Sequence, residues 1–208
     1  MSVDPSASLP PELRQGSTQP WRDRLPLPPQ AAMTPEQRAA AQALVDGPRK
    51  GVFGPFVPLM RSPELLDRIA RTGEYLRFGS VLDARVRELV TCAVSRHVGN
   101  QFEWHVHVAL AAQAGVDTGA LEALRQGARP TSGLREDEEV ALDFTRELLA
   151  THGCSEPTWQ RTVAAFGEQA VVELAALVGY FVLVCWVMNV AHTPAQKASG
   201  AAMTAFPM

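Results

Sequence analysis

The sequence predicts an all-α protein built from antiparallel helix pairs, and three observations support that prediction. Helix start signals recur along the chain, with a threonine, serine or aspartate cap that is in places followed by proline. Glycines that stop helices close the same segments, most clearly at Gly99, Gly115 and Gly153. No segment shows sustained alternation of apolar and polar residues, the pattern of a half-buried strand. An all-α fold is therefore favoured over any α/β plan.

The first three expected helices each begin at a capping residue. Residues 33–47 contain a threonine cap, proline at the first helical position and a glycine stop. A loop rich in glycine and proline follows, and residues 62–79 then begin with serine and proline and end near a glycine. Residues 83–99 open at an aspartate and close at the Gly99-Asn100 pair. That pair predicts that the chain reverses direction before the next helix.

The remaining helices complete the chain. They are expected at 101–115, 117–127, 134–153, 155–167 and 170–192. The last is the longest apolar stretch and approaches the length of a membrane span, but it carries Glu173 near its start and Asn189 and His192 near its end. We expect a buried core helix there, and no membrane partner.

Composition limits the functional classes. The chain has 208 residues, of which 46% are hydrophobic, and a net charge of −3, which fits one globular domain over residues 31–208. Residues 1–30 are rich in proline and polar residues and are expected to form an extended arm. A near-neutral charge gives no basic stripe, so nucleic acid is not an expected partner. Three widely spaced cysteines without a CxxC pair favour reduced thiols and a cytoplasmic location.

The stretch FEWHVH, residues 102–107, places a carboxylate and two imidazoles at the start of a helix. At about 100° per residue, Glu103 and His107 share one helical face, whereas His105 points to nearly the opposite side. His105 is expected at a surface or helix end. Glu88 in the preceding helix comes within plausible reach of His107 if the two helices fold back on each other. The sequence thus predicts an acid–imidazole–acid cluster, which moves protons near neutral pH.

Residues 84–116, ARVRELVTCAVSRHVGNQFEWHVHVALAAQAGV, resemble the signature of the carboxymuconolactone decarboxylase family, whose superfamily contains alkyl hydroperoxidase D. The pattern is R-E-L with an apolar run, then an aromatic residue, E-W-x-x-H and an alanine-rich helix. Glu88, Glu103, Trp104 and His107 stand at its matching positions. The resemblance implies the alkyl hydroperoxidase D-like helical fold.

The resemblance also implies an activity, that of a cofactor-independent decarboxylase acting on a small carboxylated lactone or oxo-acid. His107 would donate the proton, while Glu88 and Glu103 would orient it. Phe56, Arg77 and Trp104 are candidate substrate-binding residues, with packing as the alternative for Trp104. The hydroperoxidase branch carries cysteines four and seven positions before the closing histidine, where this chain has Glu103 and Asn100. Thiol peroxidase chemistry is therefore disfavoured.

Two alternatives stay open. Two carboxylates and an imidazole suit a divalent ion, but the E-x-x-x-H spacing differs from the E-x-x-H of di-iron bundles, so no metal is expected. A buried glutamate–histidine pair also fits a non-catalytic oligomeric or small-molecule-binding protein on the same scaffold.

The last two predictions concern a short repeated sequence pattern and the oligomeric state. V-x-E-L occurs at 86–89 and again at 171–174, with a histidine nineteen residues after each glutamate, which is consistent with a pseudo-repeat. The apolar 170–192 helix and the arm favour a homo-oligomer with the cluster near a subunit interface. The resemblance implies trimers or hexamers.

Overall fold

The computed structural model describes residues 22–195, and all regular structure in that range is helical, with no strand. The elements are a 3-10 turn Gln30–Ala32, α1 Pro35–Asp46, α2 Phe56–Leu59, α3 Pro63–Glu74, a π-helical segment Tyr75–Gly79, α4 Ala84–Val98, α5 Gln101–Ala114, α6 Thr118–Arg125, α7 Glu136–Thr151 and α8 Glu156–Ala191. The predicted all-α class is confirmed. Most of the expected arm, residues 1–21, lies outside the described residues.

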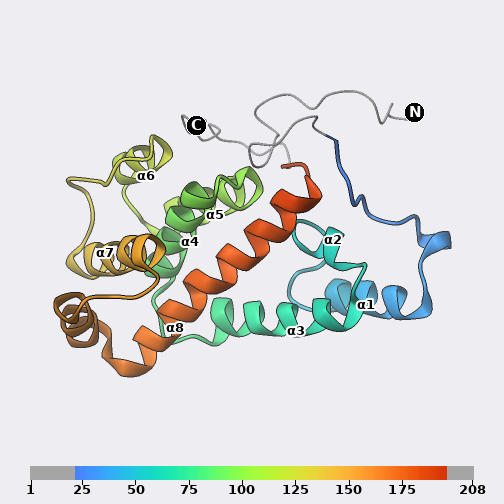
Figure 1. The fold of residues 1–208 in the computed structure, drawn as a ribbon, viewed down its shortest axis with the longest axis horizontal. Helices are drawn as coiled ribbons and strands as arrows, with labels where there is room; N and C mark the ends of the chain where they lie inside the picture. The colour runs from blue at the N-terminus through green and yellow to red at the C-terminus, as the bar shows by residue number, and fades with distance from the viewer. Residues whose placement is uncertain (1–21, 196–208) are drawn as a thin grey trace.

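Helix α8 organises the molecule. Its long apolar part runs obliquely through the middle of the view, with α4 to α7 on one side and α1 to α3 on the other (Figure 1). The main core cluster joins α8 to α3 and α4 through residues such as Leu66, Val86 and Leu174. A second cluster, which includes Leu89, Trp104 and Leu142, packs α4, α5, α6 and α7 together.

The α4–α5 hairpin forms at the predicted break. Gly99 ends α4 with φ 72° and ψ 35°, a left-handed conformation that glycine adopts without strain. The Asn100 side chain then accepts a hydrogen bond from the Glu103 backbone N–H at 2.9 Å and so caps α5. The two helices pack side by side and antiparallel. Residues in the middle of α4 therefore face residues in the first half of α5.

Helix α8 contains the last two expected helices. They meet at Gly167, whose φ of 79° and ψ of 163° are not helical, so residues 156–166 form a separate arm of the element. By length and composition, α8 is apolar enough to cross a membrane, but half of its most apolar window is buried inside this chain. The buried face includes Leu177, Phe181 and Cys185. The prediction of a core helix agrees with this packing.

The two copies of the expected pseudo-repeat have different structures. Residues 86–107 form two helices joined by the Gly99-Asn100 turn, whereas residues 171–191 are one continuous helix. Ser62 and Ser155 occupy the predicted cap positions, but neither side chain makes a capping hydrogen bond.

Candidate functional site

His107 lies between two glutamates, one from each helix of the hairpin. Its Nδ1 is 2.5 Å from Glu88 Oε2, and its Nε2 is 3.2 Å from Glu103 Oε2. The His107 side chain is 4% exposed. The ring of Phe181, from α8, packs edge-on against the imidazole with centroids 4.9 Å apart. The structure thus brings together the three residues expected to form the cluster.

The positions of both carboxylates determine the protonation state of the imidazole. A neutral imidazole has one N–H and can donate to one carboxylate, whereas the imidazolium donates to both. Burial by itself lowers the pKa of His107, but the hydrogen bonds and charges of Glu103 and Glu88 outweigh burial and raise it to about 9. His107 is therefore a buried cation at neutral pH, held by two anions.

This arrangement leaves little room for a metal at the same three side chains. Both ring nitrogens of His107 already face carboxylate oxygens, at 2.5 Å and 3.2 Å, so a metal ion would have to displace these contacts. Within residues 22–195, no group of three histidine, cysteine, aspartate or glutamate side chains is arranged to hold a metal ion. The expectation that the site works without a metal stays a prediction.

Asn100 fixes the position of Glu103. Besides capping α5, its side-chain amide donates to Asn189 Oδ1 at 3.0 Å and to the Cys185 carbonyl at 3.3 Å. Asn189 in turn donates to the Val98 carbonyl at 3.1 Å. The turn between α4 and α5 is thereby tied to α8. Asn100 stands where the hydroperoxidase branch has a cysteine, so here that position has a structural amide.

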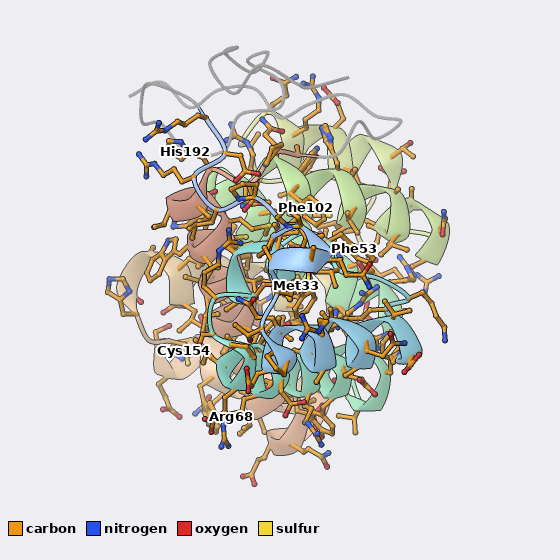
Figure 2. The ribbon with its side chains drawn as sticks, turned by 90° about the vertical axis from the view of Figure 1, so that its right-hand side faces the viewer. Met33, Phe53, Arg68, Phe102, Cys154 and His192 are labelled. Carbon is orange, nitrogen blue, oxygen red and sulfur yellow. The ribbon has the colours of Figure 1, made fainter. Side chains whose placement is uncertain are left out.

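A small cavity of about 50 Å³ opens beside Glu103 and His107. Its polar lining comes from Arg49, Arg77 and Tyr180, which belong to different parts of the chain. Aromatic rings make up much of the rest, namely Phe53, Phe56, Phe102 and Phe181. Figure 2 labels two of these rings, Phe53 and Phe102, which lie close together in the upper part of the molecule. A Cβ on Gly54 would lie 2.4 Å from Phe102, so glycine lets this loop close over the ring.

Two of the three predicted substrate-binding residues line this cavity. Phe56 and Arg77 do, whereas Trp104 does not. Trp104 is 1% exposed and packs with Leu89 and Leu121 in the second core cluster. The structure corrects its expected role to packing. Glu88 also lies outside the lining, behind the imidazole.

Sequence reasoning missed Arg49 and Tyr180. Arg49 follows a proline in the loop after α1, and Tyr180 is a single polar residue inside the apolar run of α8. A hydroxyl within such a run was the available signal, since a buried tyrosine usually has a partner for its O–H. Burial raises the pKa of Tyr180 to about 12, and Arg49 partly offsets that rise.

The expectation for His105 was wrong. It lies opposite His107 on α5 as predicted, but it is buried rather than at a surface, with 8% exposure. Both ring nitrogens lack a hydrogen-bond partner among the described residues. Burial lowers the pKa of His105, so the imidazole is neutral. Helix α5 is covered on two sides, and its composition did not reveal this.

The cysteines near the cluster are poor nucleophiles. Burial raises the pKa of Cys92 and of Cys185 well above the usual thiol range, and the nearby charges of Glu88 and Glu103 act in the same direction. Cys154 is half-buried, and none of the three cysteines forms a disulfide. A thiolate is therefore disfavoured at this site, in line with the sequence prediction.

Comparisons with known proteins agree with this fold. The sequence profile of the carboxymuconolactone decarboxylase family matches residues 63–147. No curated protein matches the chain. The crystal structure of an alkylhydroperoxidase AhpD core, an uncharacterized peroxidase-related protein from Ralstonia eutropha JMP134, superposes with a TM-score of 0.68 at 17% identity. That match covers 86% of this chain and 95% of the other.

Two further solved structures share the arrangement. An uncharacterized peroxidase-related protein from Silicibacter sp. TM1040 has a TM-score of 0.66 at 19% identity, covering 86% of this chain and 95% of its own. The debrominase Bmp8 in complex with 2,3,4-tribromopyrrole has a TM-score of 0.64 at 12% identity, covering 84% and 91%. These structures show the fold. Residues 63–147 therefore match the carboxymuconolactone decarboxylase family, and the chain has an AhpD-like helical fold.

Proposed function

We propose that the protein is a cofactor-independent enzyme that decarboxylates a small carboxylated lactone or a related oxo-acid. The observation that carries this proposal is the His107 imidazolium, held between Glu88 and Glu103 at the wall of a cavity that also contains two arginines. A buried acid with a raised pKa is suited to protonating a carbanion at neutral pH.

The proposed reaction needs one proton and no oxidant. The bond between the ring carbon and the carboxylate breaks, CO₂ leaves, and the electron pair moves into the conjugated lactone carbonyl. Arg77 stabilises the resulting oxyanion. His107 then donates a proton to carbon from Nε2, because Glu103, its partner at that nitrogen, lines the cavity and Glu88 does not. Glu88 keeps the imidazole oriented, and solvent restores the proton.

A non-catalytic oligomeric protein on the same scaffold is the second candidate, and the size of the cavity favours it. A volume of about 50 Å³ is much smaller than the several hundred Å³ of a typical small-molecule pocket. A folded oligomer that neither binds lactones nor releases CO₂ from them would support this candidate over the enzyme.

The test of the enzyme is His107→Ala assayed for CO₂ release from 4-carboxymuconolactone. We expect a loss of at least about a hundredfold in kcat, the usual contribution of a general acid, with an unchanged circular dichroism spectrum. His152→Ala is the matched control, since His152 is exposed at the end of α7. Equal turnover by the wild type and the His107 variant would contradict the proposal.

We also propose that the protein is a homo-oligomer assembled through α8. Apolar residues are exposed along that helix at alternating steps of four and three, which is the spacing of a helix–helix seam, namely Val172, Ala176, Gly179, Leu183, Trp186 and Val190. Trp186 is 61% exposed and Val190 is 68% exposed. Light scattering tests the proposal: a trimer or hexamer is expected, and a monomer at micromolar concentration would contradict it. The cytoplasmic location stays a prediction.

A further inference from the structure

The cavity beside His107 is too small for an organic substrate. Its volume of about 50 Å³ holds only a few water molecules. A ring of six or more heavy atoms therefore needs additional space next to the imidazole. The fold supplies that space on the other side of Arg49.

A second and larger cavity of about 690 Å³ lies between α1 and α3. Most of its lining is apolar, including Ala40, Ala43, Leu44, Leu66, Ala70 and Phe78. Among the described residues, Arg49 alone lines both this cavity and the one beside His107. The Arg49 side chain thus lies between the two cavities and forms the partition that separates them.

Among the described residues, the Arg49 guanidinium forms no close ion pair, although the charge of Glu74 acts on it. Its Cζ lies 4.5 Å from the centroid of the Phe56 ring, and its Nη2 donates to the Ala70 carbonyl at 3.1 Å. Its Nε is buried without a hydrogen-bond partner among the described residues, and no carboxylate in that part of the chain forms an ion pair with it. A half-buried guanidinium without a close carboxylate partner is suited to binding a ligand carboxylate through two parallel, bidentate hydrogen bonds.

Gly73 on α3 allows the partition to form. A Cβ at that position would lie 2.1 Å from the Tyr180 hydroxyl oxygen and 2.9 Å from Arg49 Nη2. Glycine therefore lets the two side chains meet over α3. The Tyr180 hydroxyl interacts with the guanidinium, which gives the partition a second polar group.

We propose that the 690 Å³ cavity is the substrate compartment, that it takes a small ring compound that carries a carboxylate, and that Arg49 binds the carboxylate and joins the compartment to His107. The apolar lining selects the ring. Of the other charged lining residues, Asp67 is paired with Arg71 at 2.9 Å and Glu74 is an anion, so Arg49 is the residue of this lining that is suited to binding a carboxylate. The link to His107 rests on the proposed function, whereas the binding of the carboxylate does not.

Benzoate is the probe, and calorimetric titration of the full chain is the measurement. We expect the wild type to bind benzoate at least about tenfold more tightly than Arg49→Gln, because a charge-assisted pair is lost. Arg68→Gln removes the same charge from an exposed position on α3 that lines neither cavity, and it should bind like the wild type. Equal affinity of Arg49→Gln and wild type, or equal binding of neutral benzyl alcohol and benzoate, would overturn the proposal.

A second variant tests the compartment itself. Ala43 is exposed at the cavity wall, so Ala43→Trp fills the space without disturbing the core. We expect it to abolish benzoate binding and to leave the pKa of His107 unchanged in an NMR titration. Unaltered benzoate binding would overturn the assignment of the compartment. If His107→Ala keeps full turnover while Arg49→Gln loses benzoate, the proposed function fails and the binding site stands.

Discussion

Two regions of the molecule share a sequence pattern but use it differently. Glu88 and Glu173 each lie in V-x-E-L, and His107 and His192 each follow nineteen residues later. The Gly99-Asn100 turn folds the first pair together, so that Glu88 contacts His107 at 2.5 Å. No break interrupts residues 171–191, and a helix rise of about 1.5 Å per residue separates the second pair by roughly 28 Å.

The partners of the second glutamate show what this difference means. Glu173 accepts hydrogen bonds from the Tyr75 hydroxyl at 2.6 Å, the Ser80 hydroxyl at 2.7 Å and the Val81 N–H at 2.9 Å, with Gln169 as a fourth donor. These neutral donors hold the segment that follows α3 against α8. Glu173 is thus a structural carboxylate. Glu88 has a titratable partner, and that partner makes its region suited to proton transfer.

The largest effect should come from removing the charge of Glu88. In Glu88→Gln, burial is opposed by Glu103 alone, so the pKa of His107 falls and less imidazolium remains at pH 7. We expect kcat for decarboxylation to fall about a hundredfold, as for loss of a general acid. Glu122→Gln, in an exposed ion pair with Arg125, is the control and should be silent. If Glu88→Gln turned over substrate as fast as Glu122→Gln, Glu88 would be a structural carboxylate like Glu173, and the proposed difference between the two regions would be wrong.

The Gly99-Asn100 turn, which brings Glu88 to His107, should contribute mainly to the stability of the fold. Asn100→Ala removes the cap of α5 and leaves the half-buried Asn189 acceptor without its donor. We expect a loss of about 2–3 kcal/mol in the free energy of unfolding. Asp117→Ala removes an exposed cap from α6 and should cost about 1 kcal/mol. Urea unfolding measures both, and equal losses would show that the tie to α8 contributes nothing.

The smallest effect on turnover should come from Glu173→Gln. Its amide nitrogen cannot accept, so some of the four donors lose their partner, and we expect a loss of about 2–3 kcal/mol in the free energy of unfolding at pH 7 with unchanged turnover. Burial raises the pKa of Glu173, but these hydrogen bonds outweigh burial and lower it to about 2. Its stabilisation is therefore complete above the unfolded value near 4.5 and is lost as pH falls towards 2. Thermal melts at pH 7 and pH 3 should show less acid sensitivity in the variant, and a marked loss of turnover would contradict a structural role.

Much of the first region could be predicted from the sequence because its determinants are local. Gly99 marks the reversal, and helical periodicity places Glu103 and His107 on one face. Register across one short turn then brings Glu88 to the imidazole. Phe56 and Arg77 were expected as substrate-binding residues from the family resemblance, and both line the cavity beside His107, but their binding role stays a prediction.

The rest depends on packing between distant segments. Arg49 and Tyr180 are 131 residues apart in the sequence, and they meet only because Gly73 lets both approach α3. No local sequence pattern predicts this contact between the two side chains. His105 was assigned to a surface because it is polar, but packing on both sides of α5 buries it. Trp104 matched a family motif, and the motif did not distinguish a core residue from a cavity residue.

An NMR titration of the His107 ring nitrogens in the wild-type protein tests most directly whether the cluster holds an imidazolium. We expect an imidazolium at pH 7, with both nitrogens protonated and a pKa of about 9. Since this value lies above the unfolded value near 6.5, the stability due to the cluster should be complete below pH 6.5 and disappear as pH rises through 9. A neutral imidazole at pH 7, with one protonated nitrogen and a pKa at or below 6.5, would contradict the central claim that His107 is a proton donor held by two carboxylates.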